Sequence, residues 1–302
     1  MNSSPFTPGA SLHEARYYTV ENHEGHMVAH CRLCPHECII ADGHTGLCRS
    51  RMCRDGRLWA LSYGEPCALA IDPIEKKPLL HYHPGTQCLS VACTGCNLRC
   101  LNCQNSSISQ TSPWMAEHAR WSPDDLVRLC LDRHLPAIAY TYTEPLTWIE
   151  YMADTARLAH EHGLRNILVS AGYVNETPLR ELLPLIDAAN IDLKSLDDDI
   201  YHRLNGASLS PVQRTLRLFR ESGAWIEITN LLVDGWNTAP DQLRKLCHWL
   251  AANGFTQVPL HFSRCFPAYR LAGLRPTPLQ TMYLARDIAH EEGIQRVHLG
   301  NV

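Results

Sequence analysis

Short apolar runs alternate with longer amphipathic segments along the chain after residue 86. The short runs predict β-strands at residues 87–92, 137–142, 166–170, 190–193, 225–233, 258–262 and 296–299. Segments with an apolar residue every three or four positions predict helices at residues 123–134, 146–162, 178–186, 211–222, 240–253 and 278–292. Because parallel strands are joined by crossover helices, this recurrence predicts a parallel sheet in an α/β protein.

Turn and cap residues support these boundaries. Proline follows a capping residue at two helix starts, in Ser122-Pro123 and Thr277-Pro278. A glycine stands between a predicted helix and the next strand at Gly163, Gly223, Gly254 and Gly293. Six or seven such units predict a full or partial parallel (βα) barrel, with a doubly wound sheet as the alternative. In both folds, ligands bind at the carboxyl ends of the strands.

Composition narrows the class of protein. The 302 residues are 45% hydrophobic and carry 27 Lys and Arg against 31 Asp and Glu, a formal net charge of −4. This length suits one large domain with a small appendage. Such a balance argues against nucleic acids or acidic membranes as partners, since proteins that bind them concentrate positive charge. The first residues contain no apolar signal segment, and no window approaches eighteen apolar residues, so we expect a cytoplasmic location.

Fourteen cysteines are the main departure from average composition, and eleven of them precede residue 104. In a reducing compartment, clustered cysteines more often hold metal than form disulfides. This asymmetry predicts a Cys-rich metal-binding segment at residues 1–86 and a (βα) domain at residues 87–302.

The first predicted strand is followed by a three-cysteine motif. Cys96, Cys100 and Cys103 have the spacing CxxxCxxC. Three thiolates can each bind one iron of a 4Fe-4S cluster, which leaves the fourth iron open for chemistry. Structural zinc is the alternative, with Cys93 as the fourth ligand.

This segment resembles the cluster loop of the radical S-adenosylmethionine (radical SAM) enzymes, in particular the branch with the pyruvate formate-lyase activating enzyme. The resemblance implies that the open iron chelates the methionyl amino and carboxylate groups of S-adenosylmethionine. One electron, from a donor such as flavodoxin or ferredoxin, then yields a 5′-deoxyadenosyl radical that abstracts hydrogen from a substrate. The protein orients the cofactor and excludes water.

Further segments resemble the radical SAM enzyme of the AmmeMemoRadiSam system, which implies partners among the other proteins of that system. The matching segments are residues 72–79, His81, 84–85, 95–97, 104–105, 140–145, 191–194 and 300–301. In two respects the chain departs from its relatives. Asn102 stands where they place an aromatic residue against the adenine, and they usually continue beyond the position of Val302 into a short cysteine-bearing tail.

The resemblance also implies cofactor-binding residues at later strand ends. Thr143 and Glu144 follow the second predicted strand, where relatives hold the methionyl amino group. Polar residues near the cofactor are implied at the next strand ends and in the His-Phe-Ser-Arg segment of the sixth strand, namely Ser170, Asp192, Lys194 and His261. These residues also have other interpretations. Glu144 suits a carboxylate at the start of a helix. Asp192 and Lys194 suit an ion pair, and His261 suits a hydrogen-bonded core histidine.

A second cysteine set lies nearer the N-terminus. Cys31, Cys34, Cys38 and Cys48 have the spacing CxxCxxxCx9C. Four thiolates close a tetrahedral site, so structural zinc and a second iron-sulfur cluster both fit. His30 and His36 are alternative ligands within the same stretch.

The leading hypothesis is a radical SAM enzyme with a 4Fe-4S cluster, S-adenosylmethionine and an unknown substrate. Within this class, installation of a glycyl radical on a partner enzyme is the first alternative. A non-catalytic zinc-binding interaction module on an α/β scaffold is the second.

Overall fold

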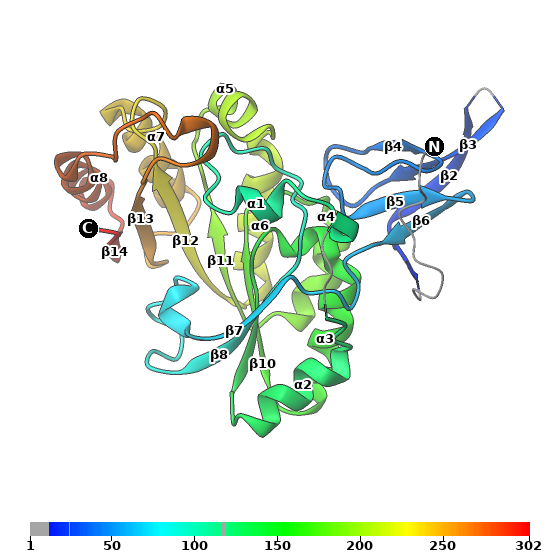
Figure 1. Ribbon diagram of the computed structural model, residues 1–302. Helices are drawn as coiled ribbons and strands as arrows, with labels where there is room; N and C mark the ends of the chain where they lie inside the picture. The colour runs from blue at the N-terminus through cyan, green and yellow to red at the C-terminus, as the bar shows by residue number, and fades with distance from the viewer. Residues whose placement is uncertain (1–11, 24, 116–118) are drawn as a thin grey trace.

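A computed structural model describes residues 12–23, 25–115 and 119–302 of the chain. At its centre is a curved eight-stranded sheet with the strand order β14-β13-β12-β11-β10-β9-β8-β7 (Figure 1). Neighbouring strands from β8 to β14 are parallel, and β7 is antiparallel to β8. The strands are β7 (Ala68–Pro73), β8 (Gln87–Ala92), β9 (Ala137–Tyr140), β10 (Arg165–Ser170), β11 (Ala188–Asp192), β12 (Trp225–Leu232), β13 (Leu260–Arg264) and β14 (Val297–Gly300).

The sheet order confirms the predicted fold class. Each parallel strand pairs with the next one along the chain, so the strands are wound in one direction, as in a partial barrel. A doubly wound sheet would reverse direction at a switch point, and this alternative is therefore wrong.

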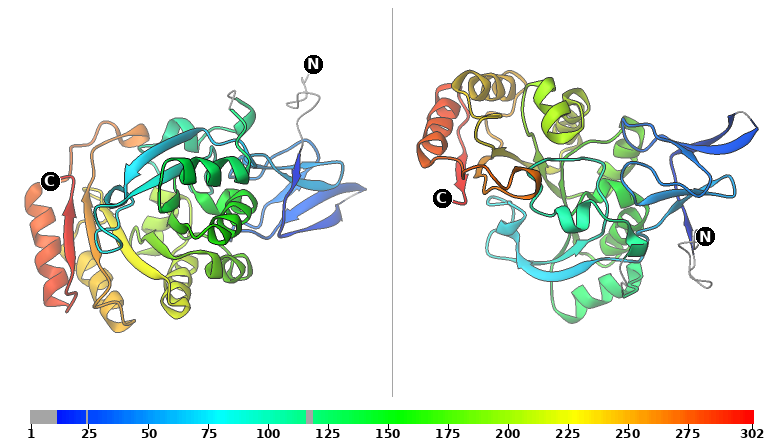
Figure 2. Two further views of the ribbon diagram at one scale, coloured as in Figure 1. Left: turned by 90° about the horizontal axis from the view of Figure 1, so that it is seen from below. Right: turned by 45° about the horizontal axis from the view of Figure 1, so that its top comes forward.

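Six longer helices follow the predicted pattern and lie on the outer face of the sheet (Figures 1 and 2). They are α2 (Pro123–Asp132), α3 (Ile149–Glu161), α4 (Glu176–Leu182), α6 (Leu209–Ser222), α7 (Pro240–Ala252) and α8 (Leu279–Glu291). Helix α2 shows why the sequence predicted the helix boundaries: Ser122 and Asp125 form a capping box ahead of a buried apolar stripe. Among the described residues, no helix is long and apolar enough to cross a membrane.

Several short elements were not predicted, because three to five residues are too few to show a period. They include α1 (Ser106–Ser109), α5 (Asp198–Ile200) and the π-helical turn η5 (Tyr201–Asn205). The 3-10 turns are η1 (Ile74–Lys76), η2 (Pro113–Met115), η3 (Pro145–Trp148), η4 (Leu183–Leu185) and η6 (Tyr269–Leu271). Three of these elements, α1, η5 and η6, form backbone hydrogen bonds with the cysteine loop described below.

The N-terminal segment forms two small antiparallel sheets on the side of the molecule away from the C-terminal strand (Figure 1). One sheet contains β1 (His13–Glu14), β6 (Arg57–Ala60) and β5 (Arg51–Arg54), and the other β2 (Tyr18–His23), β3 (His26–Cys31) and β4 (Ile39–Ala41). Buried residues of both sheets belong to the same apolar core as the barrel. β7 is part of the large sheet although it precedes the predicted boundary after residue 86. The division of the chain into two parts at that residue stays a prediction.

Candidate active site

The loop after β8 brings its three cysteines to one cavity. Cys96, Cys100 and Cys103 line a cavity of about 260 Å³ that opens at the carboxyl ends of β8 to β12. A tight turn, with the Cys103 N–H donating to the Cys100 carbonyl at 3.2 Å, brings the last two cysteines to this cavity. The loop therefore presents three thiols where a parallel sheet binds its ligands.

Each of the three thiols has a neutral polar partner. The Leu98 N–H donates to Cys96 Sγ at 3.3 Å, Asn205 Nδ2 donates to Cys100 Sγ at 3.2 Å, and Cys103 Sγ lies 3.3 Å from Ser109 Oγ. Burial raises the pKa of Cys96 and Cys100, although Lys194 and Asn205 oppose this shift for Cys100.

The donor set fits an iron-sulfur cluster better than zinc. Cys93, the fourth zinc ligand of the alternative, is buried, does not line the cavity and donates to the Ser62 carbonyl at 3.8 Å. Within residues 12–23, 25–115 and 119–302, no three His, Cys, Asp or Glu side chains form a group that could hold a metal ion. Three thiols spread around a cavity, without a fourth, match a cluster with one open iron.

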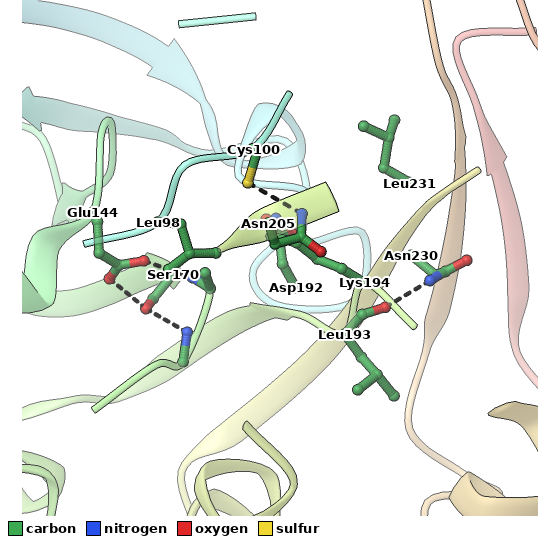
Figure 3. A network of polar contacts seen from close by, with 12 residues as sticks. Leu98, Cys100, Glu144, Ser170, Asp192, Leu193, Lys194, Asn205, Asn230 and Leu231 are labelled. Carbon is green, nitrogen blue, oxygen red and sulfur yellow. Dashed lines mark hydrogen bonds and ion pairs between the residues drawn. The ribbon is translucent and has the colours of Figure 1, made fainter. Parts of the chain in front are cut away.

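Glu144 lines the same cavity, and Figure 3 shows it hydrogen-bonded to Ser170. Its Oε1 accepts hydrogen bonds from Ser170 Oγ at 2.6 Å and the Leu146 N–H at 3.2 Å, and its Oε2 accepts one from the Ala171 N–H at 2.8 Å. Burial raises the pKa of Glu144, and these three donors partly offset the shift. The end of β10 thus holds a buried carboxylate in a fixed position. Glu144 also caps the start of η3, as its alternative interpretation anticipated.

Asp192 and Lys194 form an ion pair at the end of β11, with Nζ and Oδ2 2.9 Å apart. Both line the cavity. Burial disfavours the ammonium form, but the Asp192 carboxylate and the Cys100 thiol outweigh it and raise the pKa of Lys194. The backbone is held from two sides, since the Lys194 N–H donates to Tyr201 Oη and Asn237 Nδ2 donates to the Lys194 carbonyl. The cavity therefore contains a fixed positive charge near Cys100.

The structure brings Thr143 to the cavity but not His261. Thr143 lines the cavity and ties the β9 loop to the cysteine loop, because its Oγ1 donates to the carbonyls of Cys93 and Gly95. His261 is buried in β13, three residues before the strand ends, and its Nε2 lies 2.6 Å from Glu227 Oε2. It is the hydrogen-bonded core histidine of the alternative interpretation.

The sequence analysis missed Lys76 and Pro78, which line the cavity, and Asn205, which hydrogen-bonds to Cys100 without lining it. Lys76 and Pro78 reach the cavity from the segment between β7 and β8, where Asn190 Nδ2 donates to the Pro78 carbonyl at 2.9 Å. Both belong to the stretch 72–79 that carried the narrower resemblance, so a signal existed. Asn205 comes from η5, 105 residues after Cys100, and nothing in the sequence links the two. Asn102 also lines the cavity, with a buried Oδ1 that has no partner in the described part of the chain.

Comparison with known proteins gives one family. The sequence profile of the Radical SAM superfamily matches residues 90–250, just over half of the chain. An uncharacterised protein of Methanocaldococcus jannaschii is 43% identical over 272 residues, which cover 90% of this chain and 81% of that protein. The pyruvate formate-lyase 1-activating enzyme of Escherichia coli K12 is 23% identical over 217 residues, covering 66% of this chain and 87% of that enzyme.

Solved structures show the same fold. Streptococcus suis SuiB bound to the precursor peptide SuiA superposes with a TM-score of 0.54 at 12% identity, over 76% of this chain and 51% of that chain. The structure titled native anSMEcpe with bound AdoMet and Cp18Cys peptide superposes with a TM-score of 0.51 at 16% identity, over 70% of this chain and 62% of that chain. At these identities the likeness concerns the fold alone.

Proposed function

Because the chain belongs to the radical SAM superfamily and is a radical SAM enzyme, we propose that it binds a 4Fe-4S cluster through Cys96, Cys100 and Cys103. In this proposal it cleaves S-adenosylmethionine reductively to methionine and a 5′-deoxyadenosyl radical, which abstracts hydrogen from a substrate. The observation that carries the proposal is the shared cavity: three thiols, a buried carboxylate and a half-buried ammonium line it together. The cluster supplies the electron and the open iron.

The polar residues of the cavity have distinct parts in this proposal. Glu144 accepts the methionyl ammonium, because it is a fixed carboxylate in a buried site where a charge-assisted hydrogen bond is strong. Ser170 and the Ala171 N–H keep its two oxygens in position. Lys194 offsets the negative charge of the thiolates, and Asp192 orients Lys194. Thr143 fixes the cysteine loop against the β9 loop.

Product analysis under anaerobic conditions tests the proposal. Protein reconstituted with iron and sulfide, then given dithionite and S-adenosylmethionine, should form 5′-deoxyadenosine and methionine. The variant Cys100→Ala should lose this cluster and both products. Cys130→Ala is the control, because Cys130 is a buried cysteine that lies in α2 and does not line the cavity. Protein that binds the cluster yet forms no 5′-deoxyadenosine would contradict the proposal.

Activation of a glycyl radical enzyme is the second candidate, and the similarity to the Escherichia coli activating enzyme favours it. Incubation with a glycyl radical enzyme and S-adenosylmethionine should then produce the doublet electron paramagnetic resonance signal of a glycyl radical. A partner protein without that signal would leave direct modification of a substrate as the reaction. The non-catalytic zinc-binding module does not agree with membership in a family of enzymes.

We further propose that the enzyme acts within the AmmeMemoRadiSam system in the cytoplasm, with flavodoxin or ferredoxin as its electron donor. The support is the stretch 72–79, whose Asp72 is bound by Lys77 Nζ at 2.9 Å and Ser90 Oγ at 2.8 Å while Pro78 lines the cavity. The two other proteins of the system should co-purify with the enzyme when the three are produced together. Purification of the enzyme without either would count against this assignment.

A further inference from the structure

The four N-terminal cysteines share a second, separate cavity. Cys31, Cys34, Cys38 and Cys48 all line it. Two turns bring them together, because the Cys31 N–H donates to the Cys38 carbonyl at 2.9 Å and the Glu37 N–H to the Cys34 carbonyl at 3.0 Å. Four thiols from an 18-residue stretch thus face one enclosed space.

Buried polar groups point to an occupant of this cavity. Arg51 lines it, is 1% exposed and donates from Nη1 to Cys31 Sγ at 3.4 Å. Its Nε has no hydrogen-bond partner among the described residues. The charge of Arg51 is already paired with the Glu150 carboxylate, so Nε is the donor left for an occupant, and it suits a group with sulfur acceptors.

The second cavity adjoins the active site through the cysteine loop. Successive side chains of residues 95–100 lie on opposite sides of the backbone. Cys96, Leu98 and Cys100 line the active-site cavity, whereas Asn97 lines the N-terminal one. One short stretch of backbone therefore separates the two cysteine sites.

Three contacts fix this arrangement. A Cβ on Gly95 would lie 2.5 Å from the Cys48 carbonyl oxygen, so the two loops meet backbone to backbone. His36 Nε2 lies 2.8 Å from the Asn97 carbonyl oxygen. Arg99 Nη2 donates to the Leu47 carbonyl at 3.3 Å. The odd-numbered residues of the loop thus hold the N-terminal cysteine segment, and the even-numbered ones face the active site.

We propose that Cys31, Cys34, Cys38 and Cys48 hold a second iron-sulfur cluster, of the 4Fe-4S type, that relays single electrons across residues 95–98 to the active site. Four thiolates occupy all four irons, which leaves electron transfer as its chemistry. Zinc bound tetrahedrally by the same four thiolates is the competing occupant, which metal analysis distinguishes. The relay rests on the proposed function, but the presence of the cluster does not.

The relay step involves one electron and no bond changes. A low-potential donor of the flavodoxin or ferredoxin class is oxidised by one electron, and the N-terminal cluster is reduced. The N-terminal cluster returns to its oxidised form when the active-site cluster takes that electron.

Metal analysis of the full chain tests the site itself. Anaerobically reconstituted wild type should contain about eight iron and eight sulfide per chain, and Cys96→Ala/Cys100→Ala/Cys103→Ala should keep about four of each. Cys31→Ala/Cys34→Ala should also keep about four, whereas Cys53→Ala, a buried cysteine of β5 outside this cavity, should match the wild type. The triple variant remains informative even if Cys31→Ala/Cys34→Ala does not fold. Zinc in the triple variant, or no metal in it, would overturn the proposal.

Two kinetic measurements separate the relay from a structural role. With photoreduced flavodoxin as donor, Cys31→Ala/Cys34→Ala should lose most of the rate at which the active-site cluster is reduced. After complete reduction with dithionite, the same variant should form wild-type amounts of 5′-deoxyadenosine in one turnover. An unchanged reduction rate, or lost cleavage by the fully reduced variant, would overturn the relay. A wild type that fails to cleave S-adenosylmethionine would instead refute the proposed function and leave the metal result intact.

Discussion

Single side chains tune the active site, and Glu144 is the clearest case. In Glu144→Gln the acceptor geometry is kept and the charge is lost, so we expect S-adenosylmethionine to bind about ten- to hundredfold more weakly, the value of a hydrogen bond to a charged group. Because burial raises the pKa of Glu144, wild-type affinity should fall on acidification at a higher pH than an ordinary glutamate would allow. Calorimetric titration across pH checks both points. Equal pH dependence in Glu144→Gln would contradict them.

Asn205 is a second residue-scale determinant. Its Nδ2 donates to Cys100 Sγ, and hydrogen bonds to cluster sulfurs stabilise the reduced state, which carries more negative charge. In Asn205→Leu the reduction potential of the active-site cluster should become more negative. A tenfold loss of preference for the reduced state equals about 59 mV for one electron, and we expect a shift of that order.

A redox titration followed by electron paramagnetic resonance measures this shift. Asn253→Leu is the control, because Asn253 stands at the end of α7 and accepts from Arg217 Nε. An unchanged potential in Asn205→Leu would show that the hydrogen bond only positions the loop.

At the scale of elements, the cysteine loop and the N-terminal cysteine segment lie so close at Gly95 that no side chain fits between them. Gly95 and Gly85 both have positive φ, +90° and +81°, but only a Cβ at Gly95 meets backbone. Gly85→Ala should cost about 1–2 kcal/mol for the left-handed conformation. Gly95→Ala carries the same cost and must also move the loop, which should lower the iron content of the reconstituted protein. Iron retention in both variants at the wild-type level would show that the loops can separate without loss of metal.

At the scale of the whole molecule, a buried ion pair joins the N-terminal segment to the barrel. Arg51 in β5 pairs with Glu150 in α3, and both side chains are 1% exposed. Removal of one partner leaves the other charge buried and unpaired, so Arg51→Met should lower the free energy of unfolding by about 3–5 kcal/mol. The double variant Arg51→Met/Glu150→Leu should recover part of this loss. The thermal unfolding midpoint under anaerobic conditions should fall by several degrees in the single variant, and a double variant that is no more stable than Arg51→Met would contradict this account.

Much of the molecule was predictable from local sequence. The strands and helices of the barrel follow from apolar periodicity, and glycines, prolines and capping residues mark their ends within a few positions. The active-site cysteines lie within eight residues, so their spacing alone indicated the metal group. The radical SAM resemblance implied Thr143, Glu144, Ser170, Asp192 and Lys194, and they line one cavity because parallel strands present their carboxyl ends at one edge. His261 does not line the cavity, because it lies three residues before the end of its strand.

Information that depends on distant parts of the chain needed the tertiary structure. Strand order distinguished a barrel from a doubly wound sheet, since a pattern of apolar residues is the same for both. Only the fold shows that Asn205 reaches Cys100 and that Gly95 meets Cys48. Sequence determined which side chains carry the chemistry, because metal ligation depends on residue type and short spacing. The tertiary structure decided which sites are neighbours, because packing brings together residues that no local pattern connects.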